Sequence, residues 1–379
     1  MNLIIFLIIL LVLVLVHEFG HFFTAKKFGI RVDEFGFGFP PKIFGFKKGE
    51  TEYTINALPF GGFVKIFGET PDEAENPSLD TPSTKSDLSR SFAHKPKWQQ
   101  AIVLLAGIFS NFILAWLLFS FGFMSGLPTS VGSEPAGYTL SNVHLTVVSV
   151  LEKSPAQNSG LKSGDKIISV ESESSKKNNF DTINEINPDT LKSFILSHSE
   201  KNIKIGYIRG KDSEIIYSNL KPELSKTDGK PLIGITMDLI GTAKLPIFRA
   251  FWEGLKLDWS VTKDTITGLL GLIKGALIGK GSFGSVTGPV GMVGIVGDAY
   301  KFGFTYLLSF AALISVNLAV INLIPFPALD GGRLFFLLIE KIKGSRISPK
   351  VANYANMIGF GILILLMLFV TYHDVVKLF

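Results

Sequence analysis

The sequence predicts a polytopic α-helical membrane protein with about four spans and a soluble insert. Of its 379 residues, 47% are hydrophobic and 33 are Phe, and the mean hydropathy of +0.36 is too high for an ordinary soluble protein. The apolar residues come in blocks of the length that a membrane-crossing helix requires, about 20 residues. We expect spans at 3–25, 98–123, 305–323 with a continuation to 339, and 354–372.

Basic residues flank the predicted spans instead of forming one basic stripe, so the net charge of +5 does not indicate nucleic-acid binding. They gather near the ends of the loop between spans one and two and in the segment before span four: Lys26, Lys27, Arg31, Lys85, Arg90, Lys95 and Lys97, then Lys341, Lys343, Arg346 and Lys350. Both segments are therefore predicted to be cytoplasmic. The N-terminus, residues 373–379 and the long stretch 124–302 would then lie outside the cell membrane.

The first span contains a metal-binding motif. After the uncharged run 3–16 the chain reads His-Glu-Phe-Gly-His at 17–21. On a helix, His17 and His21 share one face and can bind one metal ion, while Glu18 lies beside them and can act on a water molecule. Ionisable residues inside a membrane are costly unless they are paired or liganded, so this motif indicates a zinc protease whose chemistry takes place within the membrane.

The alternative is a signal peptide followed by a chance pair of histidines. It is disfavoured because the first residues carry no basic region, no small-residue cleavage site follows, and apolar character resumes with Phe22 and Phe23.

A catalytic zinc site needs a third protein ligand, which can be sought by elimination. The other four histidines are poor candidates: His94 precedes span two in a polar loop, His144 and His198 fall in the insert, and His373 is predicted on the opposite side of the membrane. The chain has no Cys. Asp330 lies in an apolar region interrupted by two prolines, and broken backbone at membrane depth is tolerated where it lines a buried or wet site. We therefore expect Asp330 to complete the ligand set, and two His with one Asp favour zinc.

Two other roles for Asp330 remain open from the sequence. It could cap a helix that begins near Gly331, or it could pair with Arg333. The depth of the residues favours the metal site. His17 lies about 20 Å along the first span, near its cytoplasmic end, and span three reaches Asp330 at the same side.

Together, HEFGH at 17–21 and NLIPFPALDGG at 322–332 resemble the signatures of the site-2 protease family, particularly its bacterial regulator-of-sigma-E protease type. The resemblance extends to the stretches 58–69, 107–115 and 288–291. It implies one zinc ion per chain held by His17, His21 and Asp330, activation of water by Glu18, and a location in the inner (cytoplasmic) membrane with the active site near the cytoplasmic side. It also implies that Asn322 helps to hold the substrate near the metal. We expect Pro325, Gly61, Gly62 and Phe63 to take part in substrate binding as well.

The resemblance further implies regulated intramembrane proteolysis of single-span membrane proteins, such as membrane-bound anti-sigma factors already trimmed outside, or signal-peptide remnants. The rival reading is a non-catalytic membrane scaffold, which the intact Glu18 disfavours. A membrane oxidoreductase with His-rich boxes is a second rival, but six His with a single His pair are too few for a di-iron centre.

The insert resembles a protease-type PDZ domain. An apolar strand at 147–151 leads through Ser154, Pro155 and Ala156 to a Gly-rich turn at 160–165 and a second strand. A helix at 191–197 and a strand at 203–208 fit the remaining elements, and the polar stretch 171–189 is predicted to be a loop. Such a domain binds a peptide or substrate ectodomain by adding a strand to an open sheet edge, or excludes large substrates. An inert β-rich spacer is the alternative.

Alternating residues at 51–67 predict a β-hairpin around the turn 59–62, dipping into the membrane beside the zinc. A substrate helix hides its backbone groups, so cleavage requires unwinding, and an exposed strand edge can pair with the unwound segment. A solvent-facing loop is the alternative.

Three further segments complete the expected organisation. The stretch 69–90 is rich in polar and acidic residues and is predicted to be a mobile cytoplasmic linker, whereas 245–278 mixes aromatic and charged residues and is predicted to be an amphipathic helix on the outer membrane surface. The Gly-rich stretch 281–297 lacks the residues of a phosphate-binding loop. The expected divisions are 1–125 (spans one and two with the hairpin), 126–243 (the extracytoplasmic PDZ domain), 244–300 (the linker helix and Gly-rich loop) and 301–379 (spans three and four).

Overall fold

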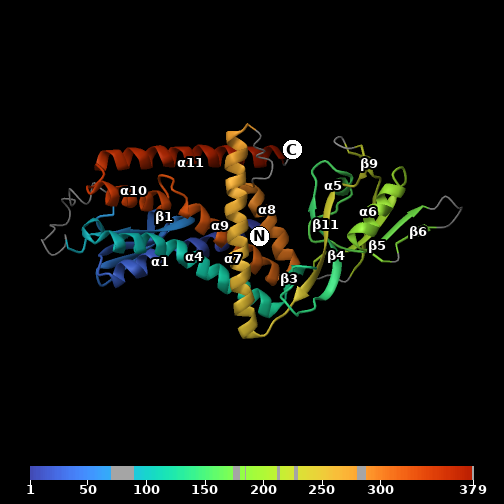
Figure 1. Cartoon of the computed structure of the whole chain (residues 1–379), viewed down its shortest axis with the longest axis horizontal. Coiled ribbons are helices and arrows are strands. Elements are labelled where there is room, and N and C mark those ends of the chain that lie inside the picture. Colours follow the sequence, from blue (N-terminus) through green and yellow to red (C-terminus); the bar gives the residue numbers. More distant parts are fainter. Residues whose placement is uncertain are drawn as a thin grey trace. The chain divides into compact units, whose positions relative to one another are not determined.

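The computed structural model of this chain describes residues 1–69, 89–173, 180–183, 185–210, 214–225, 229–279 and 287–377 (Figure 1). The chain divides into two compact units. The first comprises Met1–Phe119, Gly254–Gly297 and Phe310–Phe379, and the second comprises Ser120–Glu253 and Asp298–Ser309.

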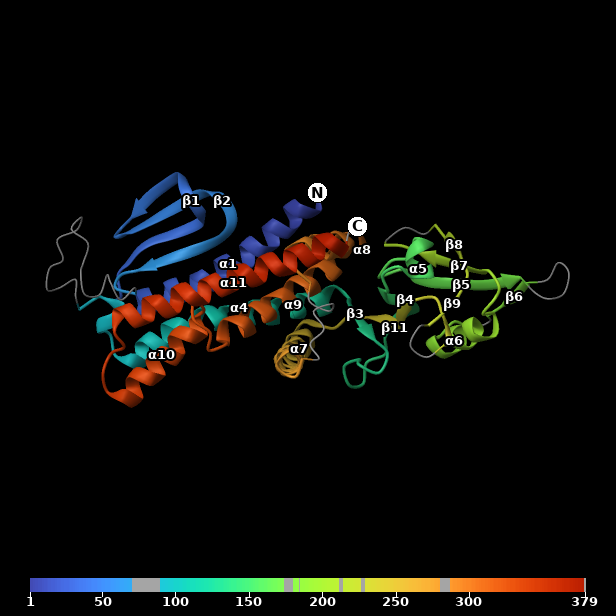
Figure 2. The same ribbon diagram turned by 90° about the horizontal axis from the view of Figure 1, so that it is seen from above.

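Within the described ranges, four helices are long and apolar enough to cross a membrane. They are α1 (Asn2–Lys27), α4 (Lys97–Ser125), α9 (Phe304–Leu323) and α11 (Pro349–Lys377, of which Pro349–Val376 is the candidate span). Each contains one predicted span, so the prediction of four helices able to span a membrane is confirmed, but the expected continuation of the third span from 323 to 339 is not part of α9. In the first unit, α1, α4 and α11 run alongside one another in both views (Figures 1 and 2).

The third span is interrupted ahead of Asp330, as the prolines predict. Helix α9 ends at Leu323, a loop follows over residues 324–329, and α10 (Asp330–Lys343) then begins. Pro325 and Pro327 cannot donate a backbone hydrogen bond, and each restricts the residue before it to an extended conformation. The loop therefore places the first turn of a new helix, with its carboxylate, at the end of the span.

A bent β-sheet lies beside α1 in the same unit (Figure 2). Its two long strands, β1 (Val32–Lys48) and β2 (Thr51–Ile66), are antiparallel and are joined by a turn at residues 49–50. Both strands bend, so the first part of β1 pairs on one side with residues 52–55 and on the other side with residues 62–66. The bend in β1 lies at Gly38, where φ is +76° and an added Cβ would lie 2.7 Å from the carbonyl oxygen of Leu58.

The predicted hairpin within 51–67 is wrong in its pairing. Its two halves do not pair with each other, because the first part of β1 lies between them. The strand β1 was not foreseen, since its Gly, Pro and Phe residues do not alternate with polar ones as a half-buried strand would. Residues 62–66 consequently form an edge of the sheet.

Hydrogen bonds and ion pairs attach this sheet to the ends of the helices. The backbone N–H of Phe67 donates to Arg31, and the N–H of Phe92, the first residue of the short 3-10 helix η1 (Phe92–His94), donates to Phe67. At the turn between the strands, hydrogen bonds from Arg90 and from Lys26 at the end of α1 lower the pKa of Glu50 to about 2. The sheet is thus held against α1 at both its base and its turn.

Beneath the sheet a buried cluster joins its base to α1, α4 and, through partly buried side chains, α10. Its buried members are Ala25, Ile30, Val32, Ile66, Phe92, Val103 and Leu104, and Leu334 and Leu337 pack against them. Of the predicted linker 69–90, residues 70–88 lie outside the described residues.

The helix α8 (Pro289–Phe302) begins in the predicted Gly-rich loop. Two of its N-terminal N–H groups, those of Gly288 and Gly291, donate to the buried carboxylate of Asp374 on α11 at 3.1 and 2.8 Å. A carboxylate at a helix N-terminus satisfies otherwise unpaired donors and favours the helix dipole. The glycine-rich stretch is therefore partly helical, and residues 280–286 of it lie outside the described part of the chain.

The second unit is built on a seven-stranded antiparallel sheet. Its order is β3 (Leu127–Ser130), β11 (Ile235–Ala243), β4 (Ser141–Val150), β5 (Lys166–Glu173), β7 (Ile203–Ile208) and β8 (Ile216–Leu220), with β6 (Phe180–Thr182) paired to β5. Two helices, α5 (Pro155–Asn158) and α6 (Pro188–Ser197), and the strand pair β9 (Glu223–Leu224) and β10 (Pro231–Leu232) complete it. The side chain of Asn187 caps α6 by accepting from the N–H groups of Asp189 and Thr190.

The predicted strands at 147–151 and 203–208 and the predicted helix at 191–197 correspond to β4, β7 and α6. The prediction of a loop over 171–189 is wrong at both ends, because β5 continues to Glu173 and pairs there with β6, and α6 begins at Pro188. The polar end of β5 forms a strand despite its low apolar content because it pairs with β6. The predicted helix at 245–278 is also confirmed, as α7 (Ile247–Leu277).

A buried ion pair stabilises the second unit. The fully buried carboxylate of Asp165 accepts two hydrogen bonds from the Arg209 guanidinium, both at 2.7 Å, and one from the N–H of Lys162. The carboxylate accordingly raises the pKa of Arg209. The geometry is bidentate, which is the strongest form of this pair.

We expect Asp165→Ala to lower the free energy of unfolding of this unit by about 2 kcal/mol, because it leaves the partly buried guanidinium of Arg209 and the N–H of Lys162 without their acceptor. The free energy of unfolding is measured by denaturant titration of the purified chain, with proteolysis of the second unit as the readout. Lys301→Ala removes an exposed pair with Asp298 and serves as the control, with an expected change of about 0.5 kcal/mol or less. Equal effects of the two substitutions would contradict a special role for the buried pair.

Candidate metal centre and active site

The two motif histidines lie one turn apart on the buried face of α1. His17 and His21 are 7% and 6% exposed, and their rings meet edge to face with centroids 4.8 Å apart. Glu18 lies one position further round the helix and is half-buried. Within the described part of the chain, its carboxylate accepts no hydrogen bond.

Asp330 meets both histidines from the first turn of α10. Its Oδ2 lies 3.0 Å from Nε2 of His17 and 3.2 Å from Nε2 of His21, and the two Nε2 atoms are 3.2 Å apart. Tetrahedral bonds of about 2.0–2.1 Å to zinc would separate the ligand atoms by about 3.3 Å. The three atoms therefore have the spacing of a three-ligand zinc site, and the convergence that the sequence predicted is present.

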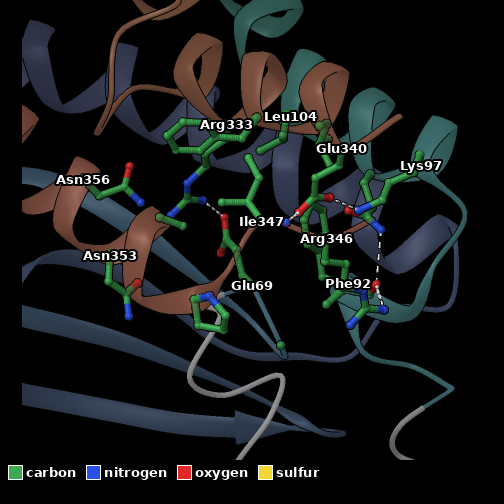
Figure 3. A pocket seen from close by; sticks show the side chains of 17 residues that line it. Glu69, Phe92, Lys97, Leu104, Arg333, Glu340, Arg346, Ile347, Asn353 and Asn356 are labelled. Atoms are coloured by element: carbon green, nitrogen blue, oxygen red, sulfur yellow. Dashed lines mark hydrogen bonds and ion pairs between the residues drawn. The ribbon is translucent and has the colours of Figure 1, made fainter. Parts of the chain in front are cut away.

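Asp330 takes neither of the two alternative roles, the pair with Arg333 or the cap of the helix that begins near Gly331. Arg333 forms its ion pair with Glu69, as Figure 3 shows, and not with Asp330. The residue that precedes α10 is Leu329, and the helix has no side-chain cap. Among the described residues, the Asp330 carboxylate contacts His17 and His21.

Each histidine is oriented by a second hydrogen bond. Nδ1 of His21 lies 2.9 Å from the carbonyl oxygen of Val103 on α4, so this nitrogen must carry the proton. The Nε2 atom then keeps its lone pair, which is the form that binds a metal.

Asn111 on α4 supplies the corresponding partner for His17. It is fully buried, its amide nitrogen lies 3.3 Å from Nδ1 of His17, and its Oδ1 has no hydrogen-bond partner among the described residues. Rotating the amide by 180° places this unpaired oxygen on Nδ1 and lets His17 donate to it, since the two amide positions are interchangeable in shape. Nε2 of His17 then also keeps its lone pair, so the donor set fits a divalent metal ion.

Close packing of α4 against α1 depends on small residues. A Cβ added at Gly107 would collide with the imidazole of His21, and one added at Gly20 would collide with the backbone of Ala106 and with Ser110. Gly107 and Asn111 lie one turn apart, on the face of α4 that meets the histidines. No role for Asn111 was predicted from the sequence, although a polar residue four positions after a glycine within an apolar span is a signal that indicates one.

The edge of the bent sheet reaches the same place. A Cβ added at Gly62 would lie 3.5 Å from Leu15 and 3.8 Å from Cγ of Glu18. Gly61 and Gly62 are buried, and the ring of Phe63 stacks on Phe39 with centroids 6.4 Å apart. Of the predicted substrate-binding residues, Gly62 is therefore placed directly beside Glu18.

Two other predicted substrate-binding residues lie at the end of α9 and in the loop that follows it. Asn322 is half-buried in the last turn of α9, and Pro325 is exposed in the loop that follows. Neither belongs to the group of donor atoms, which consists of His17, His21 and Asp330.

The remaining histidines lie elsewhere in the chain. His94 ends η1, His144 lies in β4, and His373 lies near the end of α11. His198 stacks on Phe194 and pairs with Asp181. Among the described residues, none of these four joins a cluster that could hold a metal ion.

The chain is similar to known zinc metalloproteases. The family model of peptidase family M50 matches residues 5–366. The chain is 31% identical to the regulator of sigma-W protease RasP of Bacillus subtilis, over 99% of this chain and 98% of RasP. It is 34% identical to a protein of Clostridium perfringens named as a zinc metalloprotease, over 96% of this chain and 95% of that protein. The zinc metalloprotease RasP of Geobacillus kaustophilus is 29% identical, over 99% of this chain and 97% of that protein.

These matches cover the helices that carry the two histidines and Asp330, together with the loop and sheet beside them. The chain therefore belongs to peptidase family M50 and is a zinc metalloprotease of the site-2 type.

Proposed function

We propose that this protein hydrolyses peptide bonds within or beside the transmembrane segments of single-span membrane proteins. The observation that carries the proposal is the meeting of His17, His21 and Asp330 from two separate helices, with Glu18 beside them, where α1 is apolar enough to cross a membrane. The name of RasP as a regulator of a sigma factor supports anti-sigma factors as one class of substrate. Signal-peptide remnants are a second class.

The ligands in this proposal are His17, His21 and Asp330, with Val103 and Asn111 fixing the orientation of the two imidazoles. When bound, zinc supplies a Lewis acid that polarises the peptide carbonyl and lowers the pKa of water. Glu18 takes the proton from the attacking water and passes it to the leaving amine. Its carboxylate, which accepts no hydrogen bond from the described residues and lies one residue from His17, supports this role.

The sheet edge at residues 62–66 would hold the substrate. A substrate segment must leave its helix before its carbonyl can be attacked, and the unwound backbone then needs new hydrogen-bond partners. An unpaired strand edge supplies them, and Gly62 allows the added strand to approach Glu18 closely. Phe63 and Gly61 from the sheet, with Asn322 and Pro325 from the end of α9, would contact the same segment.

The apolar surface of the sheet supports its insertion into the membrane. Its exposed side chains include Phe39, Ile43, Phe44, Phe46, Ile55 and Leu58, which are 45–69% exposed. Such a group of exposed apolar residues indicates an interaction surface, and a lipid bilayer fits it.

Residues 126–243 would form an extracytoplasmic PDZ domain that binds a peptide or substrate ectodomain, or admits substrates by size. The support is the order of β4, α5, β5, α6 and β7 around the turn 160–165. On the same orientation the N- and C-termini lie outside the cell membrane, and α7 lies on the outer surface. Exposed Phe248, Trp252 and Trp259 support such a surface position for α7.

We expect Glu18→Gln to retain about one zinc ion per chain and to lower cleavage of a single-span substrate by about 10²-fold or more, because the ligands remain and the base is lost. The measurement is cleavage of such a substrate by purified protein in detergent, with bound metal quantified in the same samples. Asp330→Ala should lose metal and activity together. Full turnover by Glu18→Gln would remove Glu18 from the mechanism, and absence of both cleavage and metal in the unaltered protein would favour the scaffold reading.

Asn111→Leu is expected to weaken zinc binding by about 10–100-fold, since the imidazole of His17 loses the acceptor that fixes its protonation. Competition with a chromogenic chelator measures the affinity. Asn317→Leu makes the same change on α9, where the amide accepts a hydrogen bond from Thr265, and should leave the affinity unchanged. Equal losses in both variants would mean that the effect comes from packing of the spans.

A further inference from the structure

The loop that presents Asp330 contains a residue in a disfavoured backbone conformation. Ala328, two positions before Asp330, has φ of +75°. In this left-handed region the Cβ of an L-residue crowds the following carbonyl, so only glycine adopts it freely. An alanine stays there when its surroundings hold it.

The hydrogen bonds of this loop show what holds it. Pro325 and Pro327 have no N–H to donate. Phe326 donates to Ile324 at 2.7 Å, and Leu329 donates to Phe326 at 3.2 Å, so both bonds are internal. The N–H of Ala328 instead donates to Oδ1 of Asn356, at 3.2 Å, on the separate helix α11.

Helix α11 approaches the loop closely at this point. A Cβ added at Gly359, one turn after Asn356, would lie 2.5 Å from the carbonyl oxygen of Pro327. Little of the apolar span of α11 is buried inside the protein. Asn356 and Gly359 therefore mark a face on which a mostly exposed helix contacts the loop before α10.

The loop in turn has little freedom at its junction with α10. An added Cβ at Gly331 would collide with the carbonyl oxygens of Leu323 and Ile324, and one at Gly332 would collide with that of Phe326. A change in the conformation of Ala328 would thus be transmitted to the first turn of α10, which carries Asp330.

Asn356 lines a cavity of about 170 Å³, and Arg333 and Glu69, which form an ion pair, line the same cavity. Figure 3 shows the three side chains. Arg333 lies one turn after Asp330 on α10, and Glu69 follows the edge strand of the sheet. The cavity leaves room for a side chain of similar size at position 356. A substitution there can remove the hydrogen bond without crowding the loop.

We propose that Asn356 is a positioning residue for the metal centre: its amide oxygen holds Ala328 in the left-handed conformation and so places the Asp330 carboxylate opposite His17 and His21. The inference rests on the proposed assignment of Asp330 as a ligand. Asn356 acts through the loop and touches neither the metal nor the substrate.

The test compares zinc affinity, measured by chelator competition on the purified chain, in Asn356→Leu and Asn356→Asp. Leucine has a similar size and no acceptor, and should weaken zinc binding by about 10–100-fold, as loss of a supporting hydrogen bond does in other metal sites. Aspartate keeps the acceptor oxygen and should bind zinc as the unaltered chain does. Under saturating zinc, Asn356→Leu should cleave substrate with an unchanged KM.

Ala328→Gly distinguishes this role from a general contribution of Asn356 to helix packing. Glycine adopts the left-handed conformation without steric cost, so Ala328→Gly should restore most of the zinc affinity to Asn356→Leu. Asn353→Leu makes the same substitution one turn earlier on α11, in the same cavity, and is expected to bind zinc normally.

Unchanged zinc affinity in Asn356→Leu, no rescue by Ala328→Gly, or an equal loss in Asn353→Leu would each overturn the inference. Asp330→Ala, measured alongside, separates this failure from failure of the ligand assignment. If Asp330→Ala loses zinc and Asn356→Leu does not, the inference alone fails. If Asp330→Ala retains zinc, both fail.

Discussion

The meeting of two imidazoles and one carboxylate at a single point is the constraint on which the rest of the first unit depends. Polar groups within membrane-spanning helices are costly unless something binds them, and here His17, His21 and Asp330 converge to 3.0–3.2 Å from helices more than 300 residues apart in the chain. Glycines at 20 and 107 let α4 pack against α1, and Val103 and Asn111 orient the rings. The proline-containing loop then ends the third span where the carboxylate is needed.

Hydrolysis inside a membrane poses a second problem, because the substrate backbone is hidden in its own helix. In the proposed mechanism, the sheet edge at residues 62–66 solves this problem by offering new hydrogen-bond partners to an unwound segment. The ion pairs of Glu50 and of Glu69 connect this sheet to α1 and to α10 respectively. The proposed substrate-binding edge and the three candidate metal ligands thus lie on connected elements, and Gly62 lies beside Glu18.

The spans, the histidine motif and Asp330 could be predicted from the sequence because each depends on a local pattern: apolar length, helical spacing, or an acid after two prolines. The pairing of the sheet could not, since the strand between its two outer segments lacks alternation and its register depends on distant residues. The supporting roles of Asn111 and Asn356 could not be predicted either. The amide of Asn111 acts on a residue 94 positions away in the sequence, and that of Asn356 on a residue 28 positions away. Hydrogen bonds between residues so far apart produce no periodic pattern in the sequence.

X-ray absorption at the zinc edge of the purified chain tests the central claim most directly, because it counts the imidazoles bound to the metal. The account expects two imidazole nitrogens, with oxygen atoms as the remaining ligands at about 2.0–2.1 Å. A spectrum with three imidazoles, or with none, would contradict a metal centre made from His17, His21 and Asp330.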